Sequence, residues 1–132
     1  MASFGLLIIR LVLGVTFIGH GAQKLFGWFG GGGVKGTGQF FESIGIKPGH
    51  AMALLAGLSE FGGGLLFALG MVTPLAALLI IGPMLMAIIK VHAANGFWSS
   101  NGGVEYNLVI MAAALGVALV GAGDYSMDAF IL

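Results

Sequence analysis

Four long apolar stretches constrain this chain more than any other feature of its sequence. They run over residues 3–23, 51–70, 74–92 and 104–121. A transmembrane helix needs about 20 mostly apolar residues, because the hydrocarbon core of a bilayer is about 30 Å thick. Each stretch is apolar on all its faces, which suits lipid better than a water-facing surface. The sequence therefore predicts an all-α integral membrane protein, a four-helix bundle that forms one domain over residues 1–132.

The composition supports this class and excludes several others. Only 8% of the residues are charged and 58% are hydrophobic, whereas a soluble domain has about 25% charged residues. The five basic and five acidic residues leave no net charge to attract a nucleic acid, so we expect the lipid bilayer as the main partner. Cysteine is absent, which excludes an iron–sulfur cluster and a thiolate metal site. We therefore predict that the chain binds no metal ion. Any electron transfer by this protein would need a quinone or another bound cofactor.

The connections between the stretches differ in length. Gly70 and Pro74 stand at the end of one stretch and the start of the next, which predicts a tight hairpin. The first connection, residues 25–50, is much longer and contains an amphipathic segment at 37–44. We expect this segment to form a short helix that lies on the membrane interface.

The lysines indicate how the bundle is oriented. All four fall on the side of the first and third connections, namely Lys24, Lys35, Lys47 and Lys90. Loops that carry lysine and arginine tend to stay in the cytoplasm. We therefore predict a multi-pass protein of the cell membrane with both termini outside the cytoplasm.

Two charged residues lie deep inside the predicted spans. A charge at the centre of a bilayer costs several kcal/mol, so Arg10 and Glu60 each need a partner or a watery cavity. Small residues flank both of them, Gly14 beside Arg10 and Gly63 and Gly64 beside Glu60. Small residues at this spacing let two helices approach closely. We predict that the first two spans meet along these faces and that Arg10 pairs with Glu60, either to fix the register of the helices or to serve a function as well.

A second set of polar residues gathers at the level of the lysines. Three helices contribute to it: His20, Lys24, Lys90, His92, Glu105, Tyr106 and Asn107. One interpretation is a cofactor-binding site in which His20, His92 and Glu105 are catalytic, because imidazole and carboxylate groups exchange protons near neutral pH. The alternative is a set of snorkelling lysines and hydrogen-bonded structural histidines. For the first interpretation we expect a cavity lined by His20, His92 and Glu105 and roofed by the first connection.

Besides a quinone, a haem with two histidine ligands is a second cofactor that this set of residues could hold. His20 and His92 come from different helices at similar depth and could in principle supply both axial ligands. Lone histidines are more often hydrogen-bonded structural groups. We predict that the chain binds no haem.

The order of these residues resembles that of the DoxX family. The resemblance is carried by four motifs, Leu-x-x-Arg10-x-x-x-Gly14-x-x-Phe17-x-x-His20-Gly21-x-x-Lys24-Leu25, Gly57-x-x-Glu60-Phe61-x-Gly63-Gly64, Val91-His92-x-x-x-Gly96-Phe97 and Asn101-Gly-Gly-x-Glu105-Tyr106-Asn107. It implies a four-helix membrane protein tied to quinone or sulfur redox chemistry, often as a partner of soluble enzymes. Family members of this kind resemble subunits of terminal quinol oxidases and of thiosulfate:quinone oxidoreductases.

Three functions are compatible with these observations. The first is a membrane subunit of an oxidoreductase system that binds a quinone at the lysine level. The second is a non-catalytic anchor for a soluble redox protein, and the third is a small transporter or proton pathway that uses Arg10 and Glu60. A second copy of the chain is a further candidate partner.

Overall fold

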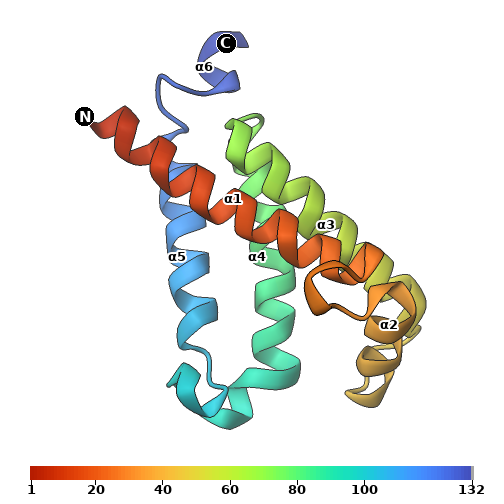
Figure 1. Ribbon diagram of the computed structural model, residues 1–132. Coiled ribbons are helices and arrows are strands. Elements are labelled where there is room, and N and C mark those ends of the chain that lie inside the picture. Colours follow the sequence, from red (N-terminus) through yellow and green to blue (C-terminus); the bar gives the residue numbers. More distant parts are fainter. Residues whose placement is uncertain (132) are drawn as a thin grey trace.

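The computed structural model describes residues 1–131, and all of their regular structure is helical. The elements are α1 (Ala2–Phe26), α2 (Gly33–Ser43), α3 (Gly49–Leu69), α4 (Thr73–Ala87), α5 (Glu105–Val120) and α6 (Met127–Ile131), with short turns between them. No strand occurs among the described residues, which confirms the all-α prediction. In Figure 1 the two termini lie at the same end of the bundle, and α2 lies near the other end.

Three helices are long and apolar enough to cross a membrane. They are α1, α3 and the stretch Thr73–Asn95, in which α4 continues into shorter turns. The fourth, α5, is apolar but has only 16 residues, a length of about 24 Å. It runs beside α4 and completes the bundle (Figure 1). The outward faces of these helices expose large apolar side chains, for example Val12, Leu58, Leu78 and Val109, as expected of a surface in contact with lipid.

The helix predicted in the first connection is present as α2. It begins earlier than expected, at Gly33, and ends at Ser43. Its amphipathic character is the strongest in the bundle, which explains why the pattern was visible in the sequence. The carboxylate of Glu42, near the end of α2, accepts a hydrogen bond from the backbone N–H of Gly49 at 3.0 Å and so caps the start of α3.

Glycines bring α1 and α3 into close contact, as the small-residue faces predicted. A Cβ added at Gly64 would lie 2.6 Å from the carbonyl oxygen of Gly14 and 2.7 Å from the nitrogen of Ile18. No side chain fits at such distances. The two antiparallel helices therefore touch backbone to backbone, and their register is fixed by these glycines.

A hydroxyl group links α3 to α4 at a proline. Pro83 lies inside α4 and has no N–H to donate to the carbonyl of Leu79, four residues earlier. The hydroxyl of Ser59 on α3 donates a hydrogen bond of 2.7 Å to that carbonyl oxygen. The break in the ladder of α4 is thus repaired by the neighbouring helix, and α4 passes through Pro83 without ending.

Candidate functional site

Arg10 is buried, but its partners are backbone carbonyls. Its guanidinium donates hydrogen bonds to the carbonyl oxygens of Ala122 at 2.7 Å, Tyr125 at 3.0 Å and Ala68 at 3.1 Å. Ala68 belongs to the last turn of α3, where carbonyls have no partner within the helix and carry the negative end of its dipole. The predicted pair between Arg10 and Glu60 is therefore wrong, because Arg10 faces the end of α3 instead of its middle.

Glu60 pairs with Lys24. The ammonium nitrogen of Lys24 lies 3.0 Å from Oε1 and 2.8 Å from Oε2 of the carboxylate. This is the one salt bridge among the described residues. The Glu60 side chain is 2% exposed and the Lys24 side chain 24%, so the carboxylate is buried while the lysine stem reaches in from the end of α1.

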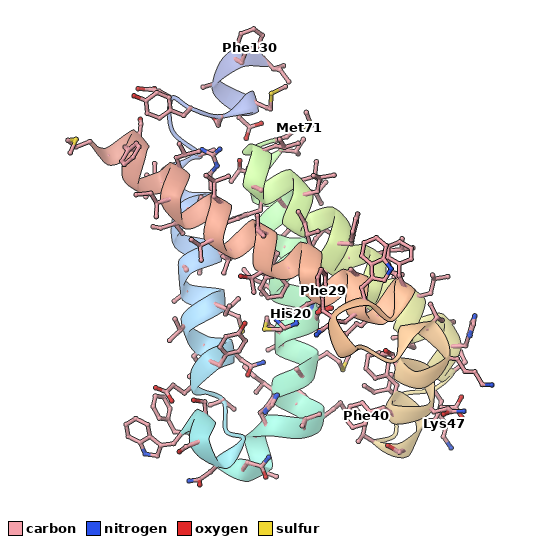
Figure 2. The ribbon with its side chains drawn as sticks, in the orientation of Figure 1. His20, Phe29, Phe40, Lys47, Met71 and Phe130 are labelled. Atoms are coloured by element: carbon pink, nitrogen blue, oxygen red, sulfur yellow. The ribbon has the colours of Figure 1, made fainter. Side chains whose placement is uncertain are left out.

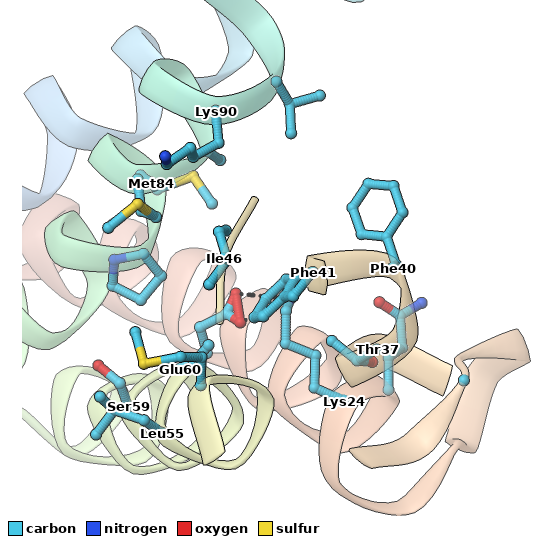
Figure 3. Close-up of a pocket in the computed structure, with 18 of the residues that line it drawn as sticks. Lys24, Thr37, Phe40, Phe41, Ile46, Leu55, Ser59, Glu60, Met84 and Lys90 are labelled. Atoms are coloured by element: carbon cyan, nitrogen blue, oxygen red, sulfur yellow. Dashed lines mark hydrogen bonds and ion pairs between the residues drawn. The ribbon is translucent and has the colours of Figure 1, made fainter. Parts of the chain in front are cut away.

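The pair lies at the edge of a large cavity of about 1060 Å³. The end of α1, the first connection with α2, the middle of α3 and the second half of α4 line it. Figure 3 shows Lys24 and Glu60 joined beside this space, with Phe40 and Phe41 from α2 on one side and Met84 from α4 and Lys90 from the turn after α4 on another. Apolar side chains make up most of the wall, and its charged residues are Lys24, Glu60 and Lys90.

The cavity contains some of the predicted site residues and omits others. Of the seven residues predicted to bind a cofactor, Lys24, Lys90 and His92 line it. The other four, His20, Glu105, Tyr106 and Asn107, do not. The expected lining by His20 and Glu105 is therefore wrong, whereas the roof formed by the first connection is confirmed by Phe40 and Phe41.

Glu105 and His92 hold the connection between α4 and α5. Oε1 of Glu105 accepts hydrogen bonds from the backbone N–H of Ser99 at 3.0 Å and from its hydroxyl at 3.1 Å. Nδ1 of His92 lies 2.6 Å from the carbonyl oxygen of Gly102. A carbonyl only accepts, so Nδ1 carries the proton, and Nε2 of the neutral ring is left as an acceptor.

His20, Tyr106 and Asn107 link neighbouring helices and do not line the cavity. Nδ1 of His20 is 3.2 Å from Oε1 of Gln23, and its Nε2 is 3.5 Å from the hydroxyl of Tyr106. The buried amide of Asn107 donates to the carbonyl oxygen of Met84 at 3.3 Å. These contacts join α1, α5 and α4. Figure 2 shows His20 in the middle of the bundle, far from Phe40 and Lys47 at one end and from Met71 and Phe130 at the other.

Lys90 and His92 lie on an irregular turn at the end of α4. Residues Ile88–His92 form a π-helical turn, with one extra residue in the turn compared with an α-helix. Such turns are rare and are found frequently at functional sites. Here the turn carries both Lys90 and His92 to the wall of the cavity.

A family model named DoxX matches residues 5–93. The chain belongs to the DoxX family. Two relatives match this DoxX chain over nearly its full length. "Putative oxidoreductase CatD" of Bacillus subtilis (strain 168) is 30% identical over 98% of this chain and 88% of its own. "Inner membrane protein YqjF" of Escherichia coli (strain K12) is 32% identical over 97% and 92%. No solved structure matches significantly.

A group that the sequence patterns missed in this DoxX chain is the carboxylate of Asp128. It accepts hydrogen bonds from the N–H of Val72 at 2.7 Å, the N–H of Thr73 at 3.0 Å and the hydroxyl of Thr73 at 2.6 Å, and so caps the start of α4. Val72 has a φ of 46°, which a β-branched residue adopts only when its surroundings hold it.

Electrostatics also favour the ionised form of Asp128. Burial by itself raises the pKa of this carboxyl, but the hydrogen bonds from Thr73 and Val72 and the charge of Arg10 outweigh it, and the pKa is lowered. The charge of Arg10, at the same end of the bundle, is one of the causes that lower this pKa. In the sequence Asp128 is only an acidic residue near the C-terminus. No local pattern indicates that it caps a helix that begins more than 50 residues earlier.

Within residues 1–131 no three His, Asp or Glu side chains gather in a way that could hold a metal ion. That this chain binds neither metal nor haem stays a prediction.

Proposed function

We propose that this DoxX protein is a membrane subunit of an oxidoreductase system and that its cavity receives the head of a quinone. The observation that carries the proposal is the cavity itself, an apolar space of about 1060 Å³ with a buried acid–base pair at its base. The name of the Bacillus subtilis relative describes an oxidoreductase, which supports the reaction class.

The residues present fit such a ligand. Small-molecule sites are concave, mostly apolar and supplied with a few polar groups that fix orientation. Phe40 and Phe41 offer flat apolar faces for a ring. Leu55, Leu58 and Met86 also line the cavity and have exposed apolar side chains, as expected if it opens toward lipid. A quinone would enter from the bilayer and, once bound, would carry electrons and protons together.

Three side chains would bind and orient the head. Lys90 carries an ammonium group with no counter-ion within salt-bridge distance among the described residues, and it can donate to a quinone carbonyl. Nε2 of His92 can accept or return a proton, because Nδ1 is held by Gly102. Lys24 supplies a second ammonium group at the base of the cavity, where Glu60 balances its charge. Electrons would come from a soluble redox partner on the lysine side, which we assign to the cytoplasm by the positive-inside rule.

The test is the binding of a ubiquinone analogue with a ten-carbon tail to the protein in lipid nanodiscs. We expect Lys90→Met to weaken binding about tenfold, because a hydrogen bond from a charged donor contributes about 1.5–3 kcal/mol. Binding is measured by native mass spectrometry, with extraction of the freshly purified protein to identify a co-purifying quinone.

Glu105→Gln is the matched control. Glu105 lies outside the cavity, and glutamine retains the oxygen that accepts the Ser99 hydrogen bonds, so quinone binding should not change. If the wild-type protein binds only phospholipid and no quinone, the non-catalytic anchor replaces this proposal.

A further inference from the structure

The wall of the large cavity carries more positive than negative charge. Lys24 and Glu60 balance each other at 2.8 Å. Lys90, the third charged residue of the wall, has no carboxylate within salt-bridge distance in the described part of the chain. Figure 3 shows its side chain well apart from the pair of Lys24 and Glu60. The cavity therefore presents one ammonium group whose charge no protein group balances.

The position of Lys90 gives this charge access to lipid headgroups. The membrane-spanning stretch Thr73–Asn95 contains Lys90 five residues before its end, which is the level at which a span meets the headgroup region. The side chain is exposed, so a charged group outside the protein can reach it. Basic pockets between transmembrane helices bind the headgroups of anionic lipids.

The rest of the wall suits an acyl chain. The cavity, of about 1060 Å³, is at the upper end of the range of about 300–1,000 Å³ for small-molecule sites. Met52, Met84 and Met86 line it, and methionine side chains adapt to ligands of variable shape. Leu55 and Leu58 line it as well and have exposed apolar side chains, which suits the entry of a chain from the bilayer. An anionic group and a long apolar chain are thus both accommodated.

We propose that the cavity binds an anionic phospholipid, with the lipid phosphate on the ammonium group of Lys90 and an acyl chain along the apolar wall. A zwitterionic phospholipid fits less well, because its own ammonium group already balances its phosphate and would add a second positive charge beside Lys90. Lys90 is also the proposed donor to a quinone carbonyl, so the lipid and the quinone would compete. Only this competition rests on the proposed function.

The experiment compares two lipids that differ only in the headgroup. Phosphatidylglycerol and phosphatidylcholine with identical acyl chains are titrated, without quinone, onto the delipidated full-length protein in a mild detergent, and native mass spectrometry measures the affinity of the first lipid bound. We expect the wild type to bind phosphatidylglycerol at least about tenfold more tightly, because a hydrogen bond from a charged donor contributes about 1.5–3 kcal/mol. Lys90→Gln should remove most of this preference, because glutamine keeps a donor but has no charge.

Lys47→Gln is the matched control. Lys47 is an exposed lysine on the same side of the bundle, outside the cavity, so this variant should keep the preference. Equal wild-type affinities for the two lipids would overturn the inference and show that Lys90 only extends into water. A preference that survives in Lys90→Gln, or that Lys47→Gln loses equally, would also overturn it.

Inorganic phosphate distinguishes a lipid site from a general anion site. It has no acyl chain, so at the same concentration it should not displace phosphatidylglycerol, and displacement would contradict a lipid ligand. The quinone titration in nanodiscs decides the proposed function separately. A protein that prefers phosphatidylglycerol and binds no quinone would refute the proposed function alone, whereas one that binds quinone without this preference would refute only the present inference.

Discussion

The register of the antiparallel helices α1 and α3 determines which charged side chains are in contact. The glycine contact that sets Gly14 against Gly64 also sets Arg10 against Gly70, where an added Cβ would lie 3.0 Å from the guanidinium carbon. The same register sets Lys24 against Gly57, one turn from Glu60. Estimates of depth alone put Arg10 and Glu60 within reach of each other. Whether the two side chains touch depends on which residues of α1 and α3 lie opposite each other, and this register separates Arg10 from Glu60.

A pair of double-mutant cycles tests these partners. We expect Lys24→Met and Glu60→Gln to show a coupling free energy of about 0.5–3 kcal/mol, because the two groups touch. Arg10→Met and Glu60→Gln should be additive to within about 0.5 kcal/mol, because they share no partner. The free energy of unfolding is measured by titration with sodium dodecyl sulfate in mixed micelles. Strong coupling of Arg10 with Glu60 would restore the original pairing.

At the scale of elements, the bundle depends on close backbone contacts and on polar links between neighbouring helices. Gly64 lets α1 touch α3, and Ser59 satisfies the carbonyl that Pro83 leaves without a donor in α4. In a bilayer no hydrophobic effect drives helices together, so packing and such hydrogen bonds carry more of the association. The position of α3 between α1 and α4 makes it the central element and places Glu60 at the cavity.

Glycine positions on α3 provide a controlled test of this packing. Gly64→Ala should destabilise the bundle, because the new methyl group would lie 2.6 Å from the carbonyl oxygen of Gly14. Gly62→Ala, two residues away, meets nothing within 4 Å and should leave stability unchanged or raise it by up to about 1 kcal/mol through helix propensity. Thermal unfolding in detergent compares the two variants. Equal effects would mean that α1 and α3 do not pack through Gly64.

At the scale of the whole molecule, the two ends of the bundle differ. The end that carries the termini is closed by the segment after α5, which Arg10 holds through Ala122 and Tyr125 and which Asp128 fastens to the start of α4. The other end carries the lysines, α2 and the cavity. The termini end has a smaller hollow of about 540 Å³ beside Arg10 and Tyr125, so the larger cavity for a ligand lies at the lysine end.

The closed end should depend on pH through Asp128. Its folded pKa is lowered, so its contribution to stability is fully present above the unfolded pKa of about 3.9 and is lost as the pH falls through the folded value. We expect hydrogen exchange at the amides of Val72 and Thr73, corrected for intrinsic rates, to accelerate on acidification below about pH 4.

Two asparagine variants separate this effect from a general loss of structure. Asp128→Asn should weaken protection of the Val72 and Thr73 amides at neutral pH and remove most of its pH dependence. Asp124→Asn changes an exposed carboxyl with no such contact, so it should behave as the wild type does. An unchanged pH profile in Asp128→Asn would show that another group controls this end.

The sequence by itself determined the membrane class, the helical stretches, the helix in the first connection and the face on which α1 meets α3. Each of these follows from apolar length or from the spacing of small residues, which are local properties of the chain. It also brought Lys24, Lys90 and His92 to the cavity side, because helix direction sets their depth. Only the tertiary structure decided that Glu60 pairs with Lys24, that Arg10 binds carbonyls and that Glu105 holds a loop. Those contacts depend on helix register and rotation, and a polar side chain takes the nearest partner that these allow.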